Sequence, residues 1–169
     1  IVNLTKLVNQ SMKLKYLVKG IIKSIPGIER IYNFHTGTGG TNSERYCYSV
    51  WLRHLIHAHK NRVHLFPERI AELGPGDSLG IGLSALISGS EHYFALDIIK
   101  FTNAEINLKI FDELVALFKN KTPIPDEKEF PLMKPTLKNY HFPDHILTNE
   151  HMSKMLDEVR IKKIRNSIK

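Results

Sequence analysis

The chain has 169 residues, of which 42% are apolar, and this is the size and composition of one globular domain with a hydrophobic core. No stretch approaches 18 uninterrupted apolar residues, and the N-terminus lacks the pattern of a secretion signal, so we expect no membrane span and no export. The single cysteine, Cys47, cannot form an internal disulfide, which predicts a reducing, cytoplasmic location.

The net charge of +7 is unevenly distributed along the chain. Residues 1–62 carry ten Lys/Arg and two Asp/Glu, residues 63–145 carry eight and twelve, and residues 146–169 carry six and three. Basic ends can attract a polyanion, but lysines on helix faces are more often simply solvated. We therefore do not expect nucleic acid as a partner.

Residues 1–64 are predicted to form an N-terminal helical segment. Its first 25 residues alternate apolar and lysine positions at helical spacing, which predicts a basic amphipathic helix. Such a helix usually packs against its own domain, and the alternative is peripheral contact with a membrane surface. Pro26 and Gly27 end it.

A glycine-rich polar loop follows at residues 36–41. It is not a phosphate-binding P-loop, because no Gly-Lys-Ser/Thr follows it and no clear strand precedes it, although it can close over a ligand. Asn42 or Ser43 is then placed to cap a helix from Glu44 to about Lys60.

The histidines of this region do not have the spacing of a metal site. On a helix His54 and His57 share a face, His59 points elsewhere, and His64 lies beyond the helix. No carboxylate or cysteine stands at a companion ligand spacing, so we expect no metal here.

The most informative stretch is residues 69–97. Residues 69–73 form a short apolar run, broken by Glu72, that stops at Gly74-Pro75-Gly76, as a buried strand does at a sharp turn. A helical pattern follows, with Asp77 or Ser78 placed as its cap and Gly89 placed to end it. A second apolar run at 93–96 ends in Asp97, so the unit is predicted to be strand, glycine loop, helix and parallel strand.

This arrangement is suited to a nucleoside. Glycines let the backbone approach a ligand at a helix N-terminus, and an acid at the tip of the second strand can accept hydrogen bonds from both ribose hydroxyls. The dinucleotide fingerprint G-x-G-x-x-G places its third glycine where this chain has Leu79, so a pyrophosphate fits less well. A ligand with a ribose and no phosphate, such as S-adenosylmethionine, does not need that glycine.

The motif formed by Glu72 to Ser78 and the strand ending in Asp97 resembles the first two cofactor motifs of class I S-adenosylmethionine-dependent methyltransferases. The resemblance implies that the cofactor is held by residues of the glycine loop and of the second strand: Glu72, Gly74, Pro75, Gly76, Asp77, Ser78, Asp97 and Ile98. It implies that Asp97 binds the ribose, that Ile98 lies against the adenine, and that Arg45 or Tyr46 can contact the carboxylate of the cofactor. More loosely, the chain is similar to the N-terminal half of bacterial methyltransferases of surface-polysaccharide clusters.

The remaining elements complete the predicted organisation. Thr102 and Glu105 form a capping box for a helix to about Lys119, which completes a cofactor-binding unit over residues 65–119. Residues 120–145 hold too many prolines for a central strand or a long helix and are predicted to form an ordered excursion or lid. Within residues 146–169, Thr148 is placed to cap one last helix through about Ile168.

The sequence thus predicts an α/β protein with a Rossmann-like, doubly wound parallel sheet of which only the first strands are present, so that the domain is expected to continue beyond residue 169. The function implied by the resemblance is methyl transfer from S-adenosylmethionine to a small molecule or a glycan precursor, and this segment alone is expected to be inactive. Two alternatives stay open: an oxidoreductase that uses NAD or a nucleotide sugar, and a non-catalytic basic binding module.

Overall fold

The computed structural model of the protein describes residues 40–63, 66–98 and 102–168. They belong to one compact unit that spans residues 38–169. The helix predicted over residues 1–25, the start of the loop at 36–41 and His64 lie outside the described residues. No helix in the described ranges combines the length and the apolar content needed to cross a membrane.

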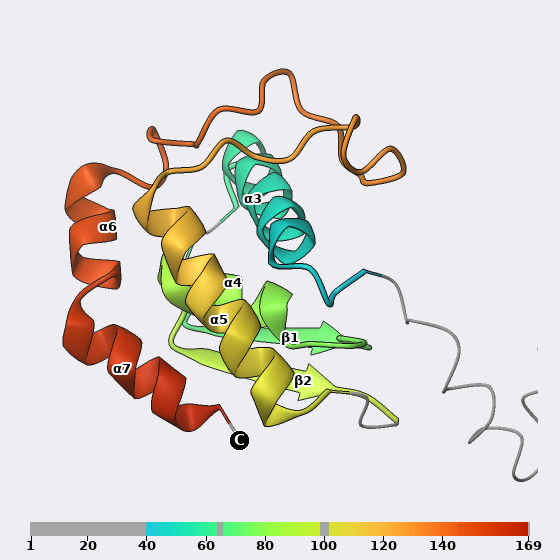
Figure 1. The fold of residues 1–169 in the computed structure, drawn as a ribbon. Coiled ribbons are helices and arrows are strands. Elements are labelled where there is room, and N and C mark those ends of the chain that lie inside the picture. Colours follow the sequence, from blue (N-terminus) through green and yellow to red (C-terminus); the bar gives the residue numbers. More distant parts are fainter. Residues whose placement is uncertain (1–39, 64–65, 99–101, 169) are drawn as a thin grey trace, which may run out of the picture. The chain divides into compact units, whose positions relative to one another are not determined.

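The described residues form a mixed α/β structure with five helices and a two-stranded parallel sheet (Figure 1). In the sheet Ile70 lies opposite Tyr93, and Leu73 lies opposite Leu96. The predicted unit of strand, glycine loop, helix and parallel strand is therefore confirmed, and it is compatible with an incomplete Rossmann-like sheet. In chain order the elements are α3 (Glu44–Lys60), β1 (Arg69–Leu73), α4 (Gly80–Ser88), β2 (His92–Leu96), α5 (Ala104–Lys119), α6 (Asn149–Met155) and α7 (Glu158–Ser167).

Helix α4 is the centre of the core. It contacts α3, α5, α6 and both strands, and its residues are apolar or small on every side, as expected for a helix surrounded by protein. The core around it is made of fully or nearly fully buried side chains from α3, α4 and α5: Cys47, Tyr48, Leu52, Leu55, Leu83, Ile87, Ile110, Phe111, Leu114 and Phe118.

The opposite face of the sheet is open. Leu73 is 82% exposed, and Phe94 and Leu96 are each 52% exposed. These three side chains share one face because residues two apart in a strand point the same way and the strands pair in register. Among the described residues, the sheet therefore has helix α4 on one face and no helix on the other.

The helix caps confirm some predictions and correct others. Ser43 caps α3, and its hydroxyl accepts the N–H of Tyr46. For α4 the cap position is Leu79, whose side chain makes no cap, so the predicted cap position is early. The Ser78 hydroxyl nevertheless accepts the N–H of Gly80, the first residue of α4. For α5 the capping box is wrong by one residue: Asn103 is the cap, because its side-chain oxygen accepts the N–H of Ile106.

The C-terminal region contains two helices where one was predicted. Thr148 caps α6 as expected, but α6 stops at Met155. The carboxylate of Asp157 accepts the N–H groups of Val159 and Arg160 and starts α7. The prediction missed this internal cap, which competes locally with a continuous helix.

The proline-rich segment between α5 and α6 contains neither helix nor strand and is held by Arg53 of α3. The fully buried guanidinium of Arg53 donates hydrogen bonds to three carbonyl oxygens of the segment, those of Pro125, Met133 and Pro135, at 3.0, 3.2 and 2.8 Å. It also lies 5.0 Å from the ring centroid of Tyr140. The segment is thus attached to the core through Arg53.

Candidate cofactor site

The glycine loop after β1 has the backbone conformation that glycine allows. Gly74 and Gly76 have φ angles of +69° and +77°, in the left-handed region that other residues rarely adopt. A Cβ added at Gly74 would meet no atom within 4 Å, so space is open beside the backbone there. The N–H of Gly74 donates to the carbonyl of Leu96 at 2.8 Å, which places the start of the loop beside the end of β2.

A hollow of about 550 Å³ lies at this carboxyl edge of the sheet. Of the eight predicted cofactor residues, Gly74, Asp97 and Ile98 line it, together with Leu73, Ala95 and Leu96. The side chain of Ile98 is fully exposed. The structure therefore brings the first glycine of the loop and the acid at the tip of β2 around one hollow, as the parallel pairing of the strands requires.

Glu72 lies half-buried on β1 and is paired with a tyrosine of β2. The hydroxyl of Tyr93 donates to Oε2 of Glu72 at 2.7 Å. Burial raises the pKa of the Glu72 carboxyl, and the hydrogen bond from Tyr93 partly offsets that rise. Burial, followed by the bond to Glu72, raises the pKa of Tyr93 far above its usual value, so Tyr93 remains a donor. Glu72 is thus a half-buried carboxyl group held by Tyr93, with one residue, Leu73, between it and the glycine loop.

The second half of the loop faces the protein instead of the hollow. The N–H groups of Asp77 and Ser78 donate to Oγ1 of Thr41 at 2.9 and 3.4 Å. The N–H of Leu79 donates to Oδ1 of Asn107 at 2.9 Å, and the N–H of Gly80 donates to the hydroxyl of Ser78 at 3.1 Å. Four successive N–H groups at the start of α4 therefore already have partners within the chain.

Ser78 has a structural position. Its side chain is 1% exposed, and its hydroxyl donates to the carbonyl of Thr41. Neither Ser78 nor its predicted companions Pro75, Gly76 and Asp77 line the hollow. Their contribution to the site is to shape the turn.

Thr41 and Asn107 were not predicted as site residues. Thr41 is the last residue of the glycine-rich loop at 36–41, which was expected to close over a ligand. Its hydroxyl accepts the N–H of Asp77 in the glycine loop that follows β1. Asn107 is 1% exposed on the buried face of α5. A polar residue in the apolar stripe of a helix is the signal that could have identified it.

Two glycines of α4 allow its neighbours to approach closely. A Cβ at Gly82 would lie 2.2 Å from the ring of Tyr93, and a Cβ at Gly80 would lie 2.5 Å from Sγ of Cys47. The close contact of helix and strand, which the third glycine provides in the dinucleotide fingerprint, is therefore provided here by Gly82. Burial raises the pKa of the Cys47 thiol to about 12, so this cysteine is a core residue and not a nucleophile.

Arg45 and Tyr46 contact the proline-rich segment. Arg45 forms a bidentate pair with Glu129 at 2.6 and 2.7 Å, and the ring of Tyr46 lies edge-on to Phe130 with centroids 5.5 Å apart. Neither residue lines the hollow. The predicted contact with a cofactor carboxylate stays a prediction.

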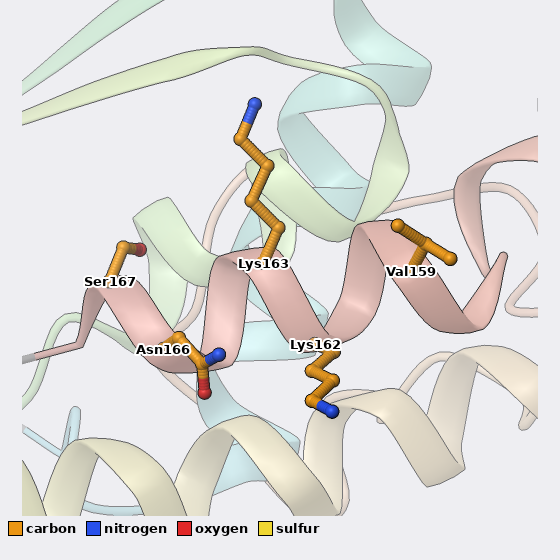
Figure 2. A pocket seen from close by; sticks show the side chains of 5 residues that line it. All are labelled: Val159, Lys162, Lys163, Asn166 and Ser167. Atoms are coloured by element: carbon orange, nitrogen blue, oxygen red, sulfur yellow. The ribbon is translucent and has the colours of Figure 1, made fainter.

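In the described ranges, one group of potential metal ligands gathers at the other end of the strands. The ligand atoms of Glu68, Glu91 and His92 lie within 4.8 Å of one another, and all three residues are exposed. Exposed carboxylates gather in this way without a metal, so the group supports no assignment. A shallow hollow on α7, lined by Val159, Lys162, Lys163, Asn166 and Ser167, is open and lacks convergent polar groups (Figure 2).

Comparisons with protein-family models, with curated proteins and with solved structures find no match to this chain. Fold and site therefore define its class: a mixed α/β protein with a parallel strand pair and a positive-φ glycine loop at the carboxyl edge of that pair.

Proposed function

We propose that the chain binds S-adenosylmethionine at the glycine loop and forms the cofactor-binding part of a methyltransferase. The observation that carries this proposal is that the two halves of the glycine loop have different surroundings. Gly74 and Asp97 border an open hollow, whereas the N–H groups of residues 77–80 are bound by the chain itself. A nucleoside ligand without a phosphate fits both halves.

The occupied N–H groups disfavour a dinucleotide. In dinucleotide-binding folds the pyrophosphate accepts hydrogen bonds from the loop and from the helix N-terminus. Here the same groups donate to Thr41, Asn107 and Ser78, and a pyrophosphate would have to displace these partners. The structure therefore gives no support to the alternative of an NAD-dependent oxidoreductase.

Each residue of the site has a role in this proposal. The carboxylate of Asp97 accepts hydrogen bonds from the two ribose hydroxyls, and Ile98 offers an apolar surface to the adenine. Gly74 allows the backbone to approach, and the negative charge of Glu72 favours the positively charged methionine end. The bound cofactor supplies a methyl group on a sulfonium centre, and the protein has to hold it in line with a nucleophile.

The methyl acceptor follows from the family resemblance alone. By that resemblance it is a small molecule or a glycan precursor; the cytoplasmic location is inferred separately, from the single cysteine.

The test is calorimetric titration with S-adenosylmethionine and, separately, with NAD. Asp97→Ala removes a charge-assisted hydrogen-bonding pair worth about 1.5–3 kcal/mol, so S-adenosylmethionine affinity should fall roughly 10- to 100-fold. Asp112→Ala is the matched control, because Asp112 is an exposed aspartate of α5 paired with Arg165. Unchanged affinity in Asp97→Ala, or tighter binding of NAD than of S-adenosylmethionine, would contradict the proposal.

A further inference from the structure

A second pocket, of about 700 Å³, lies between the C-terminal turn of α3 and residues 136–145 of the proline-rich segment. It shares no lining residue with the cofactor hollow. Figure 1 shows this segment passing alongside α3. The two walls meet where the rings of His59 and His145 lie edge-on with centroids 5.2 Å apart. We call it the interface pocket.

The lining of the interface pocket combines an apolar floor with a basic rim. Phe142 is 8% exposed, and Ile56 and Leu137 are partly buried against the core. The rim is formed by two lysines and four histidines: His57, His59, Lys60, Lys138, His141 and His145. The one acid of the lining, Asp144, is paired with Lys121, so the rim has an excess of cationic groups.

The basic groups of α3 are not needed to cap their own helix. The carbonyls of the last turn accept hydrogen bonds from residues that follow it: His57 from Asn61, and His59 from Arg62. Basic side chains at a helix C-terminus otherwise often serve these carbonyls. The side chains of His57, His59 and Lys60 can therefore serve a ligand.

The second wall is held in place before any ligand binds. Arg53 donates to the carbonyl of Pro135, and the N–H of Leu137 donates to the hydroxyl of Tyr140 at 3.0 Å. The carbonyl of Tyr140 accepts the N–H of Ile124 at 2.7 Å. A pocket fixed in this way costs little to organise on binding.

We propose that the interface pocket binds a small organic phosphate, with its apolar part on the floor and its phosphate against the lysines and histidines of the rim. A metal ion is a poorer fit. In the described ranges, the three potential ligands found within 4.8 Å of one another are Glu68, Glu91 and His92, and none of them lines this pocket. The proposal does not depend on the proposed methyltransferase function.

The experiment uses 1-naphthyl phosphate, which contains no nucleoside that could enter the cofactor hollow. Its binding to the full chain is measured by calorimetry, beside inorganic phosphate and 1-naphthol. Both fragments should bind much more weakly than the whole probe, because each lacks one half of the recognised chemistry. Equal affinity for 1-naphthol would show that the rim does not recognise the anion, which would overturn the proposal.

The lysine pair on the rim is tested by Lys60→Gln with Lys138→Gln. Loss of two charge-assisted contacts should weaken 1-naphthyl phosphate binding roughly tenfold or more. Lys162→Gln with Lys163→Gln is the matched control, because both of these lysines are exposed on α7 (Figure 2). An equal loss in both double variants would indicate attraction by net charge and overturn the proposal, and so would no loss in the first. Circular dichroism of each variant verifies that it folds.

Discussion

Ionisation of Glu72 should have opposite effects on the free energy of folding and on the binding of a positively charged ligand. Burial raises its pKa, so the ionised carboxylate costs folding free energy at neutral pH. A folded-state pKa above the unfolded value means that the stability of the ligand-free protein decreases as pH rises through that pKa. A positively charged ligand, by contrast, favours the ionised carboxylate.

The affinity for S-adenosylmethionine should therefore increase as pH rises through the raised pKa of Glu72, at pH values where the α-amino group of the ligand keeps its proton. Glu72→Gln should bind more weakly and show a flatter pH profile. Its melting temperature without ligand should equal or exceed that of the parent at pH 7. Calorimetry and thermal melts at several pH values measure both effects, and a parent affinity that decreases with rising pH would contradict this role of Glu72.

Arg53 is the residue on which the proline-rich segment depends. Arg53→Met removes the donor from the carbonyls of Met133 and Pro135. It also removes one of the two donors of the Pro125 carbonyl, which accepts from the Ser49 hydroxyl as well. We expect the free energy of unfolding to fall on the order of 3–5 kcal/mol, because buried polar groups would lose their partners. Urea denaturation measures this loss.

Arg45→Met on the same helix is the control for Arg53→Met. The pair between Arg45 and Glu129 is partly solvent-exposed, with both side chains 37% exposed. Its loss should cost at most about 1 kcal/mol. Similar losses of unfolding free energy in the two variants would show that the burial of Arg53 does not increase its contribution to stability.

At the scale of the element, the glycines of α4 allow neighbouring side chains to pack directly against its backbone. Alanine is favoured over glycine in a helix interior by up to about 1 kcal/mol, yet a Cβ at Gly82 would lie within 2.2 Å of the ring of Tyr93. Tyr93 in turn holds Glu72. The packing of α4 on β2 is thus linked to the geometry of the candidate site.

Gly82→Ala should lower the free energy of unfolding by about 1–3 kcal/mol, because the added methyl group overpacks the contact between α4 and β2. In a Tyr93→Ala background, where the ring is absent, the same substitution should be neutral or stabilising. A double-mutant cycle by urea denaturation measures the coupling. Additive effects of the two substitutions would rule out the steric explanation.

At the scale of the molecule, the exposed sheet face is the main departure from a well-covered fold. Parallel sheets are normally buried on both faces, whereas Leu73, Phe94 and Leu96 are at least half exposed here. An exposed strand edge and an apolar face favour pairing with another chain. The chain should therefore self-associate as its concentration rises.

Sedimentation velocity over a range of concentrations tests this expectation. Leu73→Ser combined with Phe94→Ser should shift the protein toward monomer. Leu132→Ser combined with Val159→Ser is the control, since these residues are 93% and 77% exposed but lie outside the sheet. A parent protein that stays monomeric at high concentration would contradict the expectation.

The central unit of strand, glycine loop, helix and strand could be predicted from the sequence. The limits of α3 and β1, the end of α5 and the parallel order of the strands follow from local periodicity and from chain breakers. So does the need for glycine at 74 and 76. These are short-range properties, so they can be read from neighbouring residues. The binding of S-adenosylmethionine and the transfer of a methyl group were predicted from the same motif and stay predictions.

The tertiary structure alone decided which groups complete the site. Thr41 reaches the loop from 36 residues away, Asn107 reaches it from 28, and Arg53 holds carbonyls more than 70 residues along the chain. No periodicity encodes such pairs, because each depends on how separate elements pack. For the same physical reason the sequence did not show that the N–H groups of residues 77–80 already have partners within the chain.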